Sequence, residues 1–391
     1  MSDGVTREAA SAAAQGVWSA LDRVIDPEIR KPITELGMVT GVTVDDAGGA
    51  DVKILLTIAG CPAARRIEAD THEAAAGAPG ITEARVEVGV MTPTERAAFV
   101  ERVRGDRGTR VTQFGPDSLT RVIAVTSGKG GVGKSSVTTG LGVARAERGL
   151  SVGIVDVDVF GFSIPALLGL SRDGVTAQPT RVGELILPPE AYGVKAISIG
   201  MFLGDTDPRK ASVSWRGPML HRTVEQFLRD VWFGDLDILL LDLPPGTGDV
   251  AISVGQLLPQ AEVIVVTTPQ EAASDVAVRS GLVARQSGQR VTGVIENMAG
   301  LAQPDGTVID VFGSGGGQLV ADRLSEDVEA AVPLLGSIPL SVAFREASDD
   351  GRPAVLHSPQ DPAAAELIRI AGVIATQGRG LAGRSLGIGL S

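Results

Sequence analysis

A glycine-rich loop near the middle of the chain constrains its fold most strongly. Residues 128–135 read GKGGVGKS, and they lie between the apolar run RVIAVTS and a segment with a helical pattern. Two glycines five residues apart, followed by Lys and Ser, form the P-loop pattern, in which backbone N–H groups curl around a polyphosphate. The N-terminus of the following helix adds positive potential. The sequence therefore predicts an ATP site between a strand and a helix.

The loop carries two lysines, and we expect them to act on different nucleotides. In this type of loop Lys134 reaches the β- and γ-phosphates, and Ser135 holds Mg²⁺. Lys129 comes too early in the loop to duplicate Lys134, and a cation supplied in trans can stabilise a transferred γ-phosphoryl group. We therefore predict a homodimer in which both lysines are catalytic. The expected ATP-binding residues of the loop are Gly128, Lys129, Gly130, Gly131, Val132, Gly133, Lys134, Ser135 and Ser136.

From residue 120 onward, short apolar runs alternate with helical stretches. This alternation predicts an α/β fold with a mostly parallel, doubly wound sheet that helices cover on both faces. Ligands in such a fold bind at the carboxyl ends of the strands. The seven expected strands lie in RVIAVTS, SVGIVDVD, VKAISIG, DILLLDLP, EVIVVTTP, VTGVIEN and LLGSIPL.

The length of 391 residues is suited to two domains. Residues 17–100 follow the order helix, strand, helix, strand, which predicts a small N-terminal α+β domain. Residues 101–118 mix charge with Gly and Pro and lack apolar periodicity, so we expect a linker there. We expect the P-loop ATPase domain over 119–376 and a flexible tail of simple composition over 377–391.

Acidic residues end two of the expected strands. Asp156 and Asp158 are two residues apart and point the same way if their strand continues. Asp156 is expected to support Mg²⁺ through water, whereas Asp242 at the end of ILLLD matches the Walker B carboxylate that orients Mg²⁺. Together with Ser135 they form the predicted magnesium site. Residues 244–248, PPGTG, are predicted to form a second switch loop.

Residues 129–135 resemble the deviant Walker A motif of the ATPase family that contains the septum-site, plasmid-partition and nitrogenase iron proteins. The resemblance implies dimerisation around two ATP molecules, with Lys129 crossing the interface. It also implies that Asp158 orients the attacking water, which makes this residue catalytic. Asn297 is similar to the adenine-contacting Asn of the family, and Pro339 and Leu340 would pack against the base.

Further motifs narrow the resemblance. The segments DVDVFGFSIP, DLPPGTGDV and ENM are similar to those of the Mrp/ApbC-type iron-sulfur cluster carrier ATPases. The N-terminal segments VIDPEI, ITELGMVTGV and TIAGCPAARRIE resemble the iron-sulfur assembly domain of PaaD and SufT type. The resemblance implies a slow, Mg²⁺-dependent ATPase that binds or transfers iron-sulfur clusters, such as a 4Fe-4S cluster. Its partners would be apo iron-sulfur client proteins or cluster assembly proteins.

The most serious departure from this family concerns cysteine. Well-studied members carry a Cys-x-x-Cys pair after the position of Asn297, whereas the only cysteine of this chain is Cys61. Thiolates are the usual cluster ligands. Cys61 lies at an expected strand-to-helix junction, where the helix dipole, Arg65 and Arg66 would stabilise its thiolate. It is therefore a candidate cluster ligand, and the alternative is a small apolar residue that closes the domain.

The formal net charge of −12 argues against non-specific binding to nucleic acid or anionic lipid, because both attract basic surfaces. The first residues lack the basic and apolar blocks of a signal peptide, and no run approaches the ~18 apolar residues of a membrane helix. We therefore expect a cytoplasmic protein without membrane or nucleic-acid partners.

Two other functions are compatible with the motifs. The first is an ATP-gated positioning switch of the partition or septum-site class, which needs a basic or amphipathic surface that the acidic charge balance disfavours. The second is a nucleotide-dependent module that docks clients through residues 17–105 and handles no metal. The missing Cys-x-x-Cys pair keeps the second alternative open.

Overall fold

The computed structural model describes residues 11–59, 63–104, 113–115, 118–159, 161–202, 217–303, 307–326 and 330–377. These residues belong to two compact units. The first unit ends before Thr112 and also includes Thr180–Leu187, and the second contains the rest of the chain. None of the described helices is long and apolar enough to cross a lipid bilayer.

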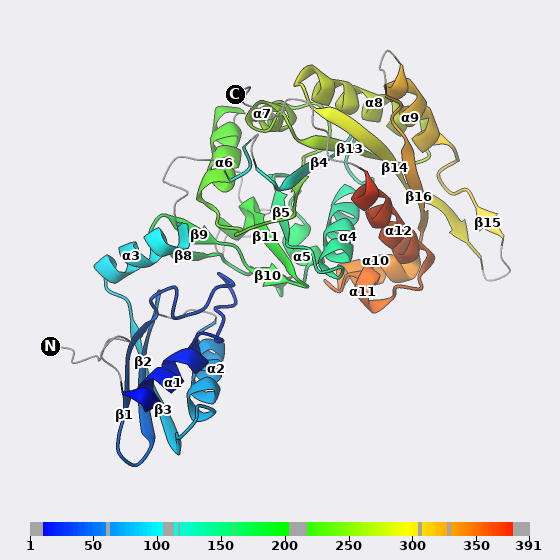
Figure 1. Ribbon diagram of the computed structural model, residues 1–391. Coiled ribbons are helices and arrows are strands. Elements are labelled where there is room, and N and C mark those ends of the chain that lie inside the picture. Colours follow the sequence, from blue (N-terminus) through cyan, green and yellow to red (C-terminus); the bar gives the residue numbers. More distant parts are fainter. Residues whose placement is uncertain are drawn as a thin grey trace, which may run out of the picture. The chain divides into compact units, whose positions relative to one another are not determined.

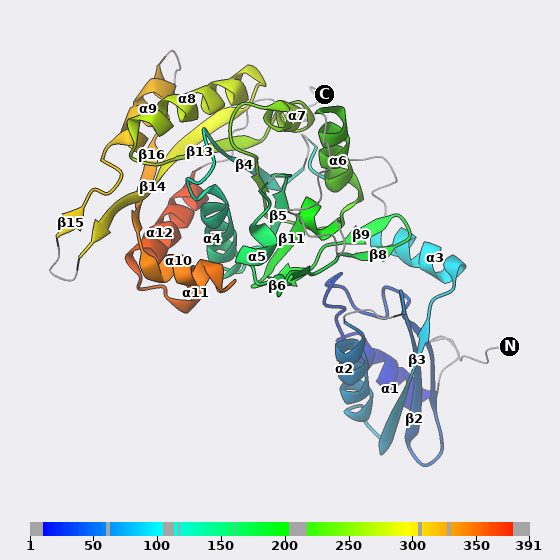
Figure 2. The same ribbon diagram turned by 180° about the vertical axis from the view of Figure 1, so that it is seen from behind.

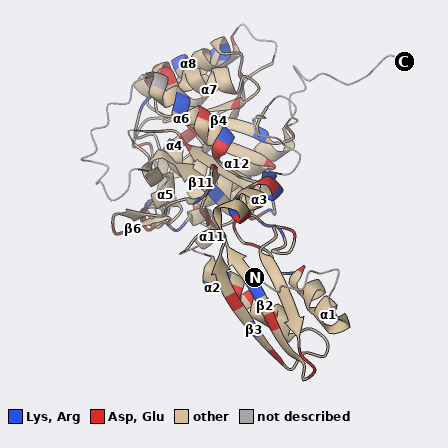
Figure 3. Ribbon diagram, turned by 90° about the vertical axis from the view of Figure 1, so that its left-hand side faces the viewer, with Lys and Arg blue, Asp and Glu red and all other residues tan. Residues whose placement is uncertain are grey.

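The first unit contains a three-stranded sheet in the order β1-β2-β3, with β1 and β2 antiparallel and β2 and β3 parallel. Alternate residues of β2 are buried under the helices, whereas the opposite face carries charged residues, which Figure 3 shows in blue and red. Lys53 Nζ and Glu87 Oε2 form an ion pair on this face at 3.2 Å. One covered and one solvated face explain the alternating sequence pattern. The main elements are α1 (Ala12–Leu21), β1 (Val39–Val44), β2 (Gly49–Leu56), α2 (Ala64–Ala76), β3 (Glu83–Val90) and α3 (Pro93–Arg104).

Two elements of this unit were not expected from the sequence, β1 and α3. Helix α3 begins with a capping box, because the Thr92 backbone N–H donates to Glu95 Oε2 at 2.8 Å and the Glu95 N–H donates to Thr92 Oγ1 at 3.3 Å. This hydrogen bond from Thr92 lowers the pKa of Glu95. The predicted linker begins at residue 101, whereas α3 continues to Arg104; residues 105–112, 116 and 117 lie outside the described residues.

A hairpin from the middle of the chain completes the first unit. It is formed by β8 (Thr180–Val182) and β9 (Leu185–Leu187), and their apolar side chains are buried. Thr180 Oγ1 donates a hydrogen bond to Glu28 Oε1 at 2.9 Å. The small domain predicted from residues 17–100 is therefore joined by a segment that the sequence analysis assigned to the ATPase domain.

The second unit contains the predicted parallel sheet, with the strand order β10-β11-β5-β12-β4-β13-β14-β15 and β16 parallel to β14 (Figures 1 and 2). All seven predicted strands are present, and the short β10 and β15 pair antiparallel at the two sides. The bounds are β4 (Arg121–Ser127), β5 (Val152–Asp156), β10 (Glu190–Ala191), β11 (Val194–Ser198), β12 (Ile238–Asp242), β13 (Glu262–Thr267), β14 (Arg290–Ala302), β15 (Val308–Ile309) and β16 (Leu334–Leu340).

Helices cover both faces of this sheet, as the near-continuous apolar strands require. Helices α4, α10, α11 and α12 lie on one face, and α6, α7, α8 and α9 lie on the other (Figures 1 and 2). The remaining elements are α4 (Lys134–Ala146), α5 (Ile164–Leu167), β6 (Ser171–Arg172), β7 (Val175–Thr176), the 3₁₀ helix η3 (Ile199–Phe202), α6 (Gly217–Asp230), α7 (Asp249–Leu257), α8 (Glu271–Gln286), α9 (Gly316–Ser325), α10 (Val342–Asp349), α11 (Ala354–His357) and α12 (Pro362–Thr376).

The main core lies between the sheet and the pair α4 and α12. Ile123 and Val125 of β4 point into it together with Leu141 of α4 and Leu367 of α12. A Cβ atom on Gly140 would lie 2.1 Å from Leu367 Cδ2, so the absence of a side chain lets the two helices approach closely. This packing fixes α4, and with it the P-loop that precedes it.

Candidate functional site

The P-loop connects the end of β4 to the start of α4, as predicted. Gly131 and Gly133 both have φ +78°, in the left-handed region that favours glycine. The space is also tight, because a Cβ on Gly128 would lie 2.4 Å from the Ala277 backbone nitrogen and one on Gly133 would lie 2.2 Å from Asn297 Nδ2. The glycines are therefore required by both backbone conformation and packing.

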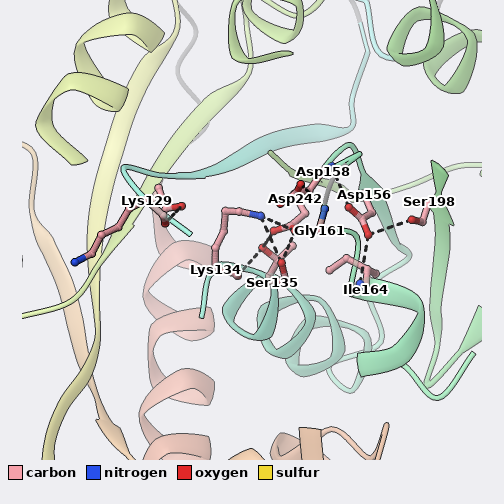
Figure 4. Close-up of polar contacts among 11 residues, drawn as sticks. Lys129, Lys134, Ser135, Asp156, Asp158, Gly161, Ile164, Ser198 and Asp242 are labelled. Carbon is pink, nitrogen blue, oxygen red and sulfur yellow. Dashed lines mark hydrogen bonds and ion pairs between the residues drawn. The ribbon is translucent and has the colours of Figure 1, made fainter. Parts of the chain in front are cut away.

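A buried polar cluster sits beneath this loop (Figure 4). Lys134 Nζ lies 2.6 Å from Asp242 Oδ2, and Ser135 Oγ donates to the same oxygen at 2.6 Å. Thr138 Oγ1 donates to Asp242 Oδ1 at 2.7 Å. The Lys134 side chain is 6% exposed and that of Asp242 is fully buried, so this ion pair is shielded from solvent. The cluster joins the end of β12 to the first turn of α4.

This cluster fits a magnesium ion. Ser135 and Asp242 offer a hydroxyl and a carboxylate oxygen 2.6 Å apart, and Mg²⁺ prefers such hard oxygen ligands. Mg²⁺ is commonly held by one or two side chains, with phosphate oxygens and waters completing its shell. Two of the three residues predicted for magnesium are therefore brought together.

The third predicted magnesium residue, Asp156, holds the loop that follows β5. Its Oδ1 accepts the Asp158 backbone N–H at 3.1 Å, and its Oδ2 accepts the Ile164 N–H at 3.3 Å and the Ser198 hydroxyl at 3.1 Å (Figure 4). Complete burial, together with the negative charge of Asp242, raises the pKa of Asp156 to about 8. Asp156 therefore organises the loop between β5 and α5, and its support of Mg²⁺ stays a prediction.

Asp158 faces the same cavity as the P-loop. Its Oδ1 accepts the Gly161 backbone N–H at 3.0 Å, and its side chain is mostly buried. The cavity measures about 720 Å³. It is lined by Ser127, Lys129–Ser136, Asp158, Gly161, Ser163, Leu220, Pro244, Pro245, Gly248, Asp249 and Val250. The P-loop, Asp158 and the predicted second switch thus line one space.

Asn297 lies behind the P-loop within β14. Its Nδ2 donates to the Val132 carbonyl oxygen at 2.8 Å, so the side chain supports the loop. Pro339 and Leu340 lie on the adjacent strand β16, where Ile338 is the register partner of Asn297. The predicted adenine contact of these residues stays a prediction.

Lys129 points away from the cluster around Lys134 (Figure 4). Its Nζ donates to Gln270 Oε1 at 2.9 Å, and its backbone oxygen accepts the Ser127 hydroxyl at 3.1 Å. The two lysines of the loop therefore have different environments, as their spacing predicts.

Cys61 lies outside the described residues, in the connection between β2 and α2. Helix α2 begins at Ala64, and Arg65 and Arg66 lie in its first turn. The role expected for Cys61 stays a prediction. Among the residues that the structure describes, there is no group of three or more His, Cys, Asp or Glu side chains that could hold a metal ion.

Sequence reasoning missed several residues of the site. Thr138 lies one helical turn after Ser135 and shares its face, a spacing that would have identified it. Gln270 lies in the short segment that follows the end of β13, so the rule that ligands bind at the carboxyl ends of strands pointed to its position. Ser198 is the last residue of β11, so the same rule pointed to its position. Leu220 carried no local signal, because long-range packing brings it to the site.

Comparisons with known proteins agree with this arrangement. Residues 118–375 match a family model described as a NUBPL iron-transfer P-loop NTPase, and residues 14–88 match one described as an iron-sulfur cluster assembly protein. The chain is 54% identical over 373 residues to the iron-sulfur cluster carrier protein of Mycobacterium tuberculosis, covering 95% of this chain and 96% of the relative.

Two further matches differ in coverage. The iron-sulfur cluster carrier protein of a Synechocystis species is 37% identical over 362 residues, which cover 92% of this chain and 96% of the relative. A solved nucleotide-binding protein from Archaeoglobus fulgidus, in complex with ADP, matches 59% of this chain and 86% of its own, with 34% identity and a TM-score of 0.49.

Proposed function

Since this chain belongs to the family of NUBPL-type iron-transfer P-loop NTPases, we propose that it is a Mg²⁺-dependent ATPase that acts as a homodimer and carries iron-sulfur clusters to apoproteins. The cluster is the cargo of this reaction. The carrier role is supported by the relatives, which are iron-sulfur cluster carrier proteins matched over nearly their whole length. The ATPase role is supported by the geometry of the site.

The observation that carries the ATPase proposal is the buried cluster of Lys134, Ser135 and Asp242 at the floor of the cavity. When ATP enters, Lys134 exchanges Asp242 for the β- and γ-phosphates, which carry more negative charge than one carboxylate and also form charge-assisted hydrogen bonds with the ammonium group. Ser135 and Asp242 would hold Mg²⁺, and the ion would neutralise charge on the phosphates when bound. The backbone N–H groups of residues 130–135 bind the phosphate chain from the other side.

Hydrolysis needs an oriented water and an additional positive charge. Asp158 lines the cavity, and Asp156 holds one end of its loop. These contacts support a role for Asp158 in accepting a hydrogen bond from a water near the γ-phosphate. Lys129 points out of its own phosphate site and supplies a charge to the nucleotide of a second copy.

Cluster handling is proposed to depend on Cys61. The chain has no other cysteine, so a dimer offers two thiolates, and a 4Fe-4S cluster needs additional ligands from a client or a small thiol. Such incomplete ligation favours a labile cluster that is passed on readily. The single cysteine also favours a second candidate, a nucleotide-dependent client-binding module that handles no metal.

Nucleotide binding and turnover of the Lys134→Ala and Lys129→Ala variants test the ATPase proposal. Lys134→Ala should abolish ATP binding in calorimetry, whereas Lys129→Ala should bind ATP normally and lose turnover, by up to ~10³-fold if it acts like a trans arginine finger. Equal turnover of Lys129→Ala and wild type would argue against the trans role. An unchanged ATP affinity of Lys134→Ala would argue against the site itself.

A further inference from the structure

The side chain of Lys129 is held by a residue of its own chain that the ATPase proposal leaves unused. Lys129 Nζ donates to Gln270 Oε1 at 2.9 Å, across 141 positions of sequence, and both residues are half-buried. Gln270 occupies the N-cap position of α8, three residues after the end of β13 at Thr267. The contact therefore joins the P-loop to the start of α8, which lies on the face of the sheet opposite to α4 (Figures 1 and 2).

Gln270 does not use its side chain to cap α8. The helix has no side-chain cap hydrogen bond at its N-terminus, and the Gln270 backbone oxygen accepts the N–H groups of Ala273 and Ser274 at 2.9 and 3.2 Å. Glutamine is not among the residues preferred at N-caps. Helix initiation alone therefore does not explain this side chain.

The elements that carry the two side chains are fixed against each other. A Cβ on Gly128 would lie 2.4 Å from the Ala277 backbone nitrogen, so the P-loop rests directly on α8. One turn further along, Ser280 Oγ donates to the Ser127 carbonyl oxygen at 3.3 Å and lies 3.5 Å from that of Gly246 in the second switch. Gln270 is thus held at a constant distance from the P-loop, within reach of Lys129.

We propose that Gln270 is a positioning residue that holds Lys129 within its own protomer until a nucleotide on a second copy draws the lysine across. This inference rests on the proposed ATPase function of a homodimer. A neutral amide oxygen is a weaker acceptor for an ammonium group than a phosphate oxygen. The contact therefore restrains Lys129 in the single chain and gives way when a γ-phosphate of a second copy arrives. Until then, the restraint keeps the Lys129 ammonium group from binding other acceptors.

Two substitutions at Gln270 should move turnover in opposite directions. Gln270→Glu replaces the amide by a carboxylate, which holds Lys129 more firmly, and should lower kcat about tenfold, whereas Gln270→Ala should raise it about threefold. KM for ATP should change little, because Lys134 and Ser135 are untouched. Gln318→Ala is the matched control, since it removes a glutamine of α9 that is bonded to Asp322 at 2.7 Å on the surface.

The effect must pass through Lys129. In a Lys129→Ala background, both Gln270 substitutions should leave the remaining turnover unchanged. A tenfold loss from Gln270→Glu that persists in this background would overturn the inference, because it would show that Gln270 acts on the fold of α8.

The contact itself can be tested without ATP. An amine-reactive ester followed by peptide mass spectrometry measures the acylation rate of Lys129, with the exposed Lys53 as internal reference. Gln270→Ala should raise the rate at Lys129 about threefold relative to Lys53, and Gln270→Glu should lower it. Unchanged rates in both variants would refute the contact. If the two variants show these changes in acylation rate but the wild-type protein hydrolyses no ATP, the ATPase proposal and the role of Gln270 in turnover would be refuted. The contact between Lys129 and Gln270 would stand.

Discussion

Lys134→Ala should cost the protein both stability and nucleotide binding. The lysine lies 2.6 Å from a fully buried Asp242, which keeps only the hydroxyls of Ser135 and Thr138 once the ammonium is gone. Removing one partner of a buried ion pair costs about 3–5 kcal/mol, since it leaves an uncompensated charge. For a unit of this size, a loss of that magnitude corresponds to a fall in Tm of roughly 6–20 °C.

The neighbouring Lys129→Ala is the matched control for stability. Its lysine is half-exposed and bonded to the neutral amide of Gln270, so its loss should cost only about 0.5–1.5 kcal/mol. The double variant Lys134→Ala/Asp242→Asn should regain part of the lost stability, because no buried charge is left unpaired. Denaturant unfolding in the absence of nucleotide measures all three variants. Equal free energies of unfolding for Lys134→Ala and Lys129→Ala would refute the reasoning.

Three other predictions concern single side chains. Asp158→Asn should bind ATP and Mg²⁺ but hydrolyse ATP slowly, so that a dimer accumulates on size-exclusion chromatography; a monomer with bound ATP would contradict this. Asp156 has its pKa raised from 3.8 to about 8, so the folded state binds its proton more tightly than the unfolded state, and its contribution to stability falls as pH rises from about 4 to 8. Unfolding in EDTA should therefore show Asp156→Asn gaining stability relative to wild type over that interval, and a constant difference would exclude this titration. Cys61→Ser should remove the visible absorbance of anaerobically reconstituted protein and leave ATPase activity near that of wild type, whereas a stable cluster in the variant would point to other ligands.

Much of the second unit was predictable because its signals are local. Strands such as β4 and β12 are buried on both faces and appear as continuous apolar runs, and the glycine spacing of the P-loop needs no tertiary context. The carboxyl-end rule then placed Asp158 and Asp242 near the loop before their contacts were known.

The features that escaped prediction depend on long-range contacts or on weaker local patterns. Helix α3 has a weak apolar pattern, although its start was marked by the capping box of Thr92 and Glu95 and by Pro93 as the first helical residue. Burial of the β8–β9 hairpin in the first unit could not be inferred, because its partner Glu28 is 152 positions away. The contact between Lys129 and Gln270 is non-local for the same reason.

The central claim is that this chain delivers iron-sulfur clusters under the control of ATP, and cluster transfer measures it most directly. Protein reconstituted anaerobically with iron and sulfide is mixed with an apo 4Fe-4S enzyme, and recovery of that enzyme's activity is followed with and without Mg²⁺ and ATP. The account predicts that the enzyme recovers activity faster than with equal amounts of free iron and sulfide, and that ATP changes the rate of recovery. With the Lys134→Ala variant, the rate of recovery should be the same with and without ATP. A wild-type protein that takes up no cluster and recovers the enzyme no faster than the free ions would contradict the carrier function.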